Sequence, residues 1–392
     1  MQRAINGISS NEGGIQIRGT AIRELDKAKQ HFSRYLKDLG IGQYVKMIDE
    51  RVTSPGFRGF QLRDLSSKKW APVGDTTQLC EKLNLDTRAN PVDLEREIVI
   101  SMLLCPVPFQ FPSFDELMSS IRIRKNIVEA ARKTSLAFAT HEAERPPEYW
   151  TYDEDRGFIL RPGRSLITAL ERATQPENSG TRYTFSCRRA AEYICLLGMA
   201  TEASSCNLEL FQCMHQQAET RAIKGSEFER TFLRQIGSPS NPLPVRFFVP
   251  GDRTWFRNPD HDSSEVTGYE GSWTFYLGSG LFADFWRPDR IYDLTTKCLT
   301  IYHWRNSTYR DSSGDLQMDE QQVESQVEST LADPVATDKI LREMLQIQEP
   351  MDTFGGGCVE AHREHARQIC RGTSDLVLPD ITTSQRTVAQ LN

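Results

Sequence analysis

The stretch GTRYTFSCRRAAEYICLLGMA, residues 180–200, decides the fold class. A short β-prone run, Tyr-Thr-Phe, precedes a cysteine, and apolar residues then recur at helical spacing: Ala190, Ala191, Ile194 and Leu197. This pattern predicts an extended segment that turns into a helix near Cys187. The first turn of a helix stabilises a thiolate, and Arg188 and Arg189 add positive charge. Cys187 is therefore a candidate nucleophile, and the alternative is an ordinary buried thiol.

Composition narrows the class of protein. The chain has 392 residues, of which 38% are hydrophobic and 26% charged, as in a folded globular protein. A net charge of -6 without a dense Lys/Arg block argues against nucleic acid as a partner. The most apolar stretch, IVISMLLCPVPFQF, contains two prolines and is shorter than the roughly 20 residues that cross a bilayer, so no membrane partner is expected. The N-terminus lacks the pattern of a secretory signal, and nine scattered cysteines indicate reduced thiols, so we expect a cytoplasmic protein.

Helical and strand signals occupy different parts of the chain. Helical periodicity is found at 20–38, at 112–139 and through most of 165–220, whereas 54–91 looks irregular. After Pro239 the runs PVRFFVPGDRTWFRNP, GSWTFYLGSGLFADFW and CLTIYHWRNSTY are short, aromatic and separated by turn residues, which is typical of strands. Helices followed by antiparallel strands predict an α+β fold.

The C-terminal part has a different composition. From Asp311 to about Asp338 it is rich in Gln, Glu, Ser and Asp, which predicts disorder, followed by a short helix. The run CVEAHREHARQIC contains Cys358, His362, His365 and Cys370, but four ligands on one straight helix cannot converge on zinc, so a partner-facing helix is the interpretation. The expected domains are a helical N-terminal extension with an irregular linker (1–104), a catalytic core (105–311) and a flexible acidic tail with short helices (312–392).

Several of these motifs together resemble a known family. They are CPVPFQFPSFDELMSSIRIRKNIVEAARKTSLAFAT, YTFSCRRAA, FFVPGDRTWFRNPDHD and YLGSGLFADF. In this order, over about residues 105–310, the chain resembles the bacterial spore-coat transglutaminases, which are protein-glutamine gamma-glutamyltransferases with a papain-like (NlpC-like) fold. The resemblance implies a papain-like core and acyl transfer from a protein glutamine to a lysine amine through a cysteine thioester. It implies no cofactor, no metal, and protein substrates that bear Gln and Lys.

The resemblance also implies a set of catalytic residues. Cys187 matches the family nucleophile, while the two family carboxylate positions are occupied by Ser186 and Ser272. Glu270 precedes Ser272 by two residues, so on a strand both side chains share a face and Glu270 can replace the missing carboxylate. Asp284 stands where the family has a histidine. For both acidic residues the alternative is a solvated loop position.

Four further residues are less direct candidates for the catalytic site. His303, on a predicted strand, is either a general base or a core histidine. Trp255, Trp273 and Trp286 are either walls of a substrate tunnel or sheet packing. The alternative functions are a cysteine peptidase or amidase of the same fold, which needs a histidine base, and an inactive relative kept as a binding or structural module.

Overall fold

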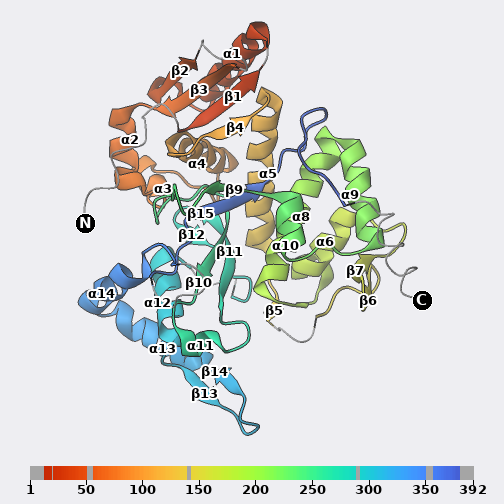
Figure 1. Ribbon diagram of the computed structural model, residues 1–392, viewed down its shortest axis with the longest axis vertical. Coiled ribbons are helices and arrows are strands. Elements are labelled where there is room, and N and C mark those ends of the chain that lie inside the picture. Colours follow the sequence, from red (N-terminus) through yellow and green to blue (C-terminus); the bar gives the residue numbers. More distant parts are fainter. Residues whose placement is uncertain are drawn as a thin grey trace. The chain divides into compact units, whose positions relative to one another are not determined.

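The computed structural model describes residues 13–19, 21–50, 56–138, 143–287, 292–349 and 356–379. The chain forms two compact units (Figure 1). Unit 1 comprises Met1–Leu117, Gln235–Asp284 and Asp289–Glu364, and unit 2 comprises Met118–Arg234, Phe285–Pro288 and His365–Asn392. Helices and strands are mixed in both units, which confirms the α+β class. No helix in the described ranges combines the length and the apolar character needed to cross a membrane.

Most strands belong to unit 1. Its elements are β1 (Ile15–Gly19), α1 (Ile22–Asp38), β2 (Val45–Glu50), β3 (Gly56–Leu62), α2 (Asp64–Trp70), α3 (Leu79–Leu83), α4 (Pro91–Leu104), β4 (Phe109–Phe111), β10 (Arg253–Arg257), α11 (His261–Ser264), β11 (Gly271–Gly278), β12 (Leu281–Phe282), α12 (Leu294–Trp304), β13 (Thr308–Arg310), β14 (Leu316–Met318), α13 (Glu320–Leu331) and α14 (Pro334–Met344). Two single-turn 3₁₀ helices, Gly42–Tyr44 and Pro72–Gly74, complete it.

Unit 2 is mainly helical. Its elements are β5 (Ala137–Phe138), β6 (Trp150–Asp153), β7 (Gly157–Leu160), α6 (Leu166–Thr174), α7 (Pro176–Ser179), β8 (Thr184–Phe185), α8 (Cys187–Cys206), α9 (Leu208–Thr220) and α10 (Ser226–Phe232). The division between the units falls within α5 (Phe114–Lys133), β9 (Leu233–Gly237) and β15 (His362–Ala366). Helix α8 approaches α5 closely at Gly198, where a Cβ atom would lie 2.6 Å from Cγ1 of Ile127, so only glycine fits there.

The N-terminal part of unit 1 is a four-stranded sheet with helices. The strand order is β2-β3-β1-β4, and β1 pairs antiparallel with β3 and parallel with β4. Helix α1 confirms the predicted helix at 20–38, and its apolar face is anchored by Phe32, whose ring packs edge-to-face on Phe60 of β3. The N-terminal extension expected to be helical contains β1, β2 and β3 as well as helices. The expectation that 54–91 is irregular is wrong, because β3, α2 and α3 lie there.

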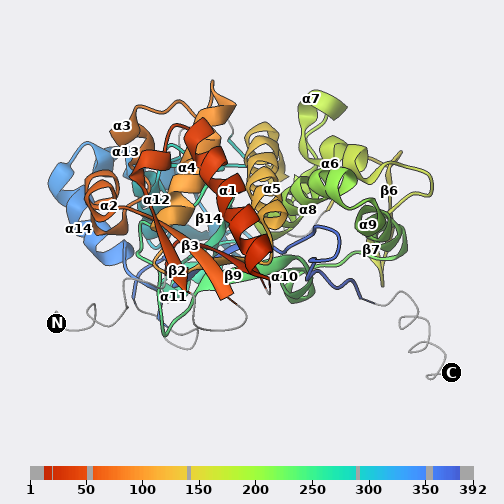
Figure 2. The ribbon, with the colours of Figure 1, turned by 90° about the horizontal axis from the view of Figure 1, so that it is seen from above.

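The second sheet has the strand order β12-β11-β10-β15-β9. Its register places Trp255 opposite Trp273 and Phe256 opposite Ser272. Phe256 and Tyr276 belong to a buried core that includes Cys298 and Leu299 of α12 and continues into α13 and α14. Figure 2 shows these three helices grouped together. One face of the sheet is therefore closed by helices.

A buried carboxyl group fixes the turn between β11 and β12. Glu97 of α4 accepts hydrogen bonds from the Tyr276 hydroxyl (2.8 Å), the Cys80 thiol (3.0 Å) and the Ser279 backbone N–H (3.0 and 3.1 Å). Ser279 has a φ of 56°, a left-handed conformation that non-glycine residues seldom adopt. These contacts explain why the YLGSG motif forms a defined turn.

Three predictions about β-prone or polar runs are wrong. PVRFFVP contains no strand, although β10 lies in the rest of that run. Residues 298–304, predicted as part of a strand, belong to α12, because Leu294, Cys298 and Leu299 bury one helical face. CVEAHREHARQIC is not a helix, since His362–Ala366 form β15 between β9 and β10.

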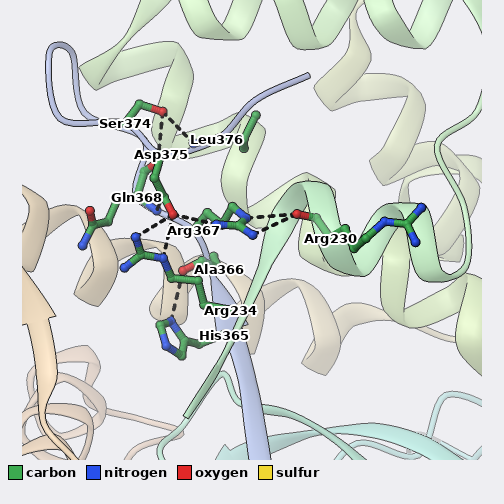
Figure 3. Close-up of polar contacts among 9 residues, drawn as sticks. All are labelled: Arg230, Arg234, His365, Ala366, Arg367, Gln368, Ser374, Asp375 and Leu376. Atoms are coloured by element: carbon green, nitrogen blue, oxygen red, sulfur yellow. Dashed lines mark hydrogen bonds and ion pairs between the residues drawn. The ribbon is translucent and has the colours of Figure 1, made fainter. Parts of the chain in front are cut away.

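The disorder predicted from Asp311 to about Asp338 is also wrong, while the short helix predicted after it is confirmed by α14. The polar run contains β14, α13 and α14, and Val323 and Val327 of α13 are buried in the core. Farther on, Asp375 accepts hydrogen bonds from Arg234 (2.6 Å) and Arg367 (2.7 Å), both within unit 2 (Figure 3). The expected division of the chain into domains at 1–104, 105–311 and 312–392 stays a prediction.

Candidate active site

Cys187 is the first residue of helix α8, as the sequence pattern predicts. The preceding strand β8 pairs parallel with β5 and delivers the chain to the helix. Ser186 is the N-cap, and its hydroxyl accepts a hydrogen bond from the backbone N–H of Arg189 (3.5 Å). The Cys187 side chain is half-buried and forms no disulfide. A thiol at this position lies next to the N–H groups that a helix leaves without intrahelical partners, and these groups stabilise a thiolate or an oxyanion.

The two arginines after Cys187 are both engaged in ion pairs. Arg188 pairs with Glu229 of α10 (2.8 Å), and Arg189 pairs with Glu192 one turn along α8. Carboxylates thus offset the positive charge that these two arginines were expected to add near the thiol. The N-terminus of α8 places the positive end of the helix dipole at Cys187.

The other thiols differ in their suitability as nucleophiles. Burial and the nearby Glu97 carboxylate raise the pKa of Cys80, and a hydrogen bond with Cys358 together with burial raises the pKa of Cys298. Cys206, the last residue of α8, has a lowered pKa because its thiolate accepts a hydrogen bond from Cys370. Cys206 is therefore the natural comparison for Cys187 in any test of reactivity.

Ser272 lies on β11 opposite Phe256, on the sheet face that α12 covers. Its hydroxyl accepts a hydrogen bond from the ammonium group of Lys297, a buried residue of α12. The same ammonium group lies 4.6 Å from the centre of the Tyr292 ring. The position that the resemblance assigns to a carboxylate is thus occupied by a hydroxyl beside a buried cation.

The two acidic candidates lie outside the strands. Glu270 occupies a bend directly before β11, is exposed, and accepts a hydrogen bond from the Asn258 N–H through its backbone carbonyl (3.0 Å). Asp284 lies two residues beyond β12 and is half-buried. The expectation that both are strand residues is wrong, while their catalytic roles stay predictions.

His303 belongs to α12 and not to a strand. It is buried, its Nε2 lies 2.8 Å from the Thr330 hydroxyl of α13, and burial lowers its pKa. These contacts give His303 a packing role between two helices, and they agree with the interpretation as a core histidine.

The three tryptophans do not form one group. Trp255 and Trp273 are cross-strand neighbours with ring centres 5.1 Å apart, and the Arg253 guanidinium lies 3.7 Å from the centre of the Trp273 ring. Trp286 belongs to unit 2, where its ring packs edge-to-face on Phe138. The substrate tunnel stays a prediction.

An acidic group on the sheet was missed by the sequence analysis. Burial raises the pKa of the Glu360 carboxyl to about 8, although the carboxyl accepts a hydrogen bond from the Trp255 N–H (3.0 Å). His362 Nε2 lies 3.8 Å from Glu360, and Glu364 forms a buried ion pair with Arg253 (3.1 Å). The spacing of two between Glu360, His362 and Glu364 is the strand signal that could have identified them. Within the described residues, no group of three metal-binding side chains is close enough together to hold a metal ion.

The site residues lie in a segment that known proteins share. Residues 75–294 match the family model described as protein-glutamine gamma-glutamyltransferase. The protein-glutamine gamma-glutamyltransferase of Halalkalibacterium halodurans is 25% identical over 201 residues, 48% of this chain and 62% of that protein. The Bacillus licheniformis protein of the same description is 23% identical over 214 residues, 52% of this chain and 75% of that protein. A solved structure, the transglutaminase from Geobacillus stearothermophilus without its C-terminal extension, shares 20% identity over 54% of this chain and 96% of that chain, with a TM-score of 0.38.

The family match covers more than half of the chain and includes Cys187, Glu270, Ser272, Asp284 and the three tryptophans, while His303 and Glu360 lie outside it. The chain belongs to the protein-glutamine gamma-glutamyltransferase family.

Proposed function

We propose that this protein transfers the acyl group of a protein glutamine to a lysine amine and so forms an isopeptide crosslink. The half-buried thiol at the first position of α8, inside the segment that matches the family, carries the proposal. The partners are proteins that bear accessible Gln and Lys side chains. When water replaces the amine, the same intermediate gives deamidation.

The chemistry divides into two acyl transfers. The Cys187 thiolate attacks the carboxamide carbon, the C–N bond breaks, and ammonia leaves after taking up a proton. The lysine amine then attacks the thioester, loses a proton and releases the thiolate. First-turn N–H groups of α8 can stabilise the oxyanion in each tetrahedral intermediate.

A proton carrier has to serve both steps. Glu270 is our first candidate and Asp284 the second, because Ser272 offers only a hydroxyl that already accepts from Lys297. The Glu270 carboxylate is exposed, so a bound substrate can reach it, and a carboxylate can accept a proton in one step and return it in the other.

Incorporation of a fluorescent primary amine into dimethylated casein tests the proposal. We expect Cys187→Ala and Cys187→Ser to abolish incorporation, and Cys213→Ala, a change at an exposed thiol of α9, to retain it within about twofold. Glu270→Gln should reduce the rate by roughly two orders of magnitude, and Asp284→Asn by less.

Amine incorporation, measured together with ammonia release, separates the proposed function from the alternatives. Ammonia release by the wild-type protein without amine incorporation would indicate an amidase, and the absence of both would indicate an inactive relative. Full activity in both carboxylate variants would exclude Glu270 and Asp284 as proton carriers while leaving the role of Cys187 intact.

A further inference from the structure

Arg145 is a buried arginine to which the proposed reaction assigns no role. It belongs to unit 2, lies in the irregular segment before β6, and is 6% exposed. A guanidinium stays charged at physiological pH, and burial of a charge is costly unless other groups compensate for it. The contacts that compensate for this cost show which elements Arg145 holds together.

The hydrogen bonds of Arg145 hold strand β8 on the side opposite β5. Its Nη1 donates to the Thr184 carbonyl (3.0 Å) and to the Glu144 carbonyl. The Glu144 backbone N–H donates to the same Thr184 carbonyl (3.4 Å). The preceding carbonyl, that of Tyr183, accepts from the Ala137 N–H of β5 (3.0 Å). Successive carbonyls of a strand point to opposite sides, so β8 is held from both sides.

The guanidinium group also contacts the aromatic side chains that join β8 to α8. Its central carbon, Cζ, lies 3.3 Å from the centre of the Phe185 ring and 4.7 Å from that of the Tyr193 ring. Phe185 is the last residue of β8, Tyr193 lies on α8, and their rings pack edge-to-face with centres 5.1 Å apart. Contacts between a desolvated guanidinium and an aromatic ring are strong for their type. Arg145 therefore helps to set the angle at which β8 enters α8.

The Cys187 thiol depends on the junction between β8 and α8. A single residue, Ser186, separates Cys187 from Phe185. The first-turn N–H groups point along the helix axis, so a change in the angle between β8 and α8 moves these groups and the thiol together. A displacement of about 1 Å at a reacting atom can lower a rate a hundredfold.

We propose that Arg145 is a positioning residue for Cys187. It holds Thr184 and Phe185 of β8 against Tyr193 of α8, and so keeps the first turn of the helix in the orientation that attack on a carboxamide requires. The kinetic consequences rest on the proposed acyl transfer. The effect on the thiol itself is measured by alkylation, which needs no acyl transfer.

Steady-state amine incorporation into dimethylated casein gives the first test. In Arg145→Met an apolar side chain of similar reach replaces the buried charge, an exchange that often costs little stability, and the Thr184 carbonyl still accepts from the Glu144 N–H. We expect kcat to fall about tenfold or more while KM for casein stays within about twofold, because orientation changes and substrate binding does not.

Two further variants show whether the buried cation is what matters. Arg145→Lys keeps a cation that can donate to the Thr184 carbonyl, so it should recover at least about threefold of the lost kcat. Arg164→Met is the matched control, because Arg164 is an exposed arginine of unit 2 that also lies over an aromatic ring, that of Tyr149 (5.7 Å). It should behave as the wild-type protein.

Iodoacetamide labelling with peptide mapping separates positioning from a general loosening of the fold. In Arg145→Met, Cys187 should react about threefold or more slowly at pH 7, because its thiolate is less well aligned with the helix N–H groups. Cys195, which is buried on the same helix, should stay as protected as in the wild-type protein. Faster labelling of both thiols would indicate a merely structural role and would overturn the proposal.

A second variant decides the question if Arg145→Met does not fold. Phe185→Leu removes the ring on which the guanidinium lies and leaves an apolar core, so it should lower kcat and slow Cys187 labelling in the same way.

The remaining outcomes distinguish this proposal from the proposed function. Slower Cys187 labelling in Arg145→Met, found together with a wild-type protein that incorporates no amine, would contradict acyl transfer and support positioning. Unchanged kcat and unchanged Cys187 labelling in a folded Arg145→Met would overturn positioning and leave acyl transfer standing. Equal kinetics for Arg145→Lys and Arg145→Met would overturn the role of the cation.

Discussion

Glu360 is a carboxylic acid that keeps its proton at neutral pH. Its pKa of about 8 results first from burial and then from the charge of Glu364, against the opposing effects of the Trp255 N–H and of Arg363 and Arg253. In the unfolded chain the pKa has its ordinary value near 4.5. Between these two values the native state holds one more proton than the unfolded state, so the free energy of unfolding falls as the pH rises.

We therefore predict that Glu360→Gln removes part of the loss of stability between pH 5 and pH 8. The amide keeps an acceptor for the Trp255 N–H but cannot ionise. At about 1.4 kcal/mol per pKa unit, the wild-type protein should lose a few kcal/mol more than the variant over this window. Urea unfolding at several pH values measures the difference, and Glu328→Gln, at an exposed position of α13, is the control. Identical pH profiles for wild type and Glu360→Gln would show that Glu360 has an ordinary pKa.

Sequence patterns located some of these residues and missed others. Cys187 could be placed because a helix start is encoded locally, by Ser186 and the apolar periodicity after it. Glu360 could not, because its environment comes from Trp255 on a strand about 100 residues earlier in the chain. No local pattern could show that the Ser272 hydroxyl accepts a hydrogen bond from the Lys297 ammonium group either.

Helix α8 is the element on which the proposed chemistry depends. Its N-cap, Ser186, occupies a position where the family resemblance expects a carboxylate, and the Ser186 hydroxyl bonds to the Arg189 N–H. A carboxylate there would improve the cap and complement the helix dipole. It would also place negative charge next to Cys187 and raise the pKa of the thiol.

A carboxylate at position 186 is therefore expected to increase the stability of the protein and to decrease the reactivity of the Cys187 thiol. We predict that Ser186→Asp raises the unfolding free energy by up to about 1 kcal/mol but slows iodoacetamide labelling of Cys187 at pH 7 several-fold. Ser186→Ala should cost about 1 kcal/mol and leave the labelling rate within about twofold. Peptide mapping reports the rates, with Cys206 and Cys213 as internal references. Faster labelling of Cys187 in Ser186→Asp would contradict the electrostatic argument.

Among the helices and strands, the periodicity of apolar residues predicted a helix correctly where one face of that helix is buried by neighbouring elements. The helices α1, α5 and α8 follow the predicted pattern. Residues 298–304 and 362–366 were assigned the wrong type, because β-prone residues form part of α12 and a polar, charged run forms β15. In both cases tertiary packing outweighs local propensity.

The order of the chain does not follow the order of the folded layers. Strand β15, near the C-terminus, lies between β9 and β10 in the five-stranded sheet. Helices α13 and α14 fill the same core as Phe256 and Tyr276, which are encoded much earlier. Composition alone predicted a flexible acidic tail, because it counts polar residues without showing which face of a helix they occupy. The buried positions of these helices are few but regularly spaced.

We predict that a chain ending at Asp311 does not fold cooperatively. It lacks Val323, Val327, Met344, Cys358 and Val359, all nearly fully buried in the core. At about 1.5–3 kcal/mol for each large apolar side chain, this loss is comparable with the 5–15 kcal/mol that stabilises a typical domain. The truncation also removes β15, which exposes the edge of β10 and leaves Arg253 without its Glu364 partner.

A chain ending at Pro379 is the matched control, because it keeps every contact described above. Circular dichroism and thermal unfolding should show a single sharp transition for this control, as for the full chain. They should show a broad transition or none for the chain ending at Asp311. Amine incorporation should follow the same order, since an unfolded sheet cannot present Glu270 or Asp284. A cooperative transition near the full-length melting temperature in the shorter chain would instead support a domain boundary at 311, with the core of 105–311 stable without the helices that cover its sheet.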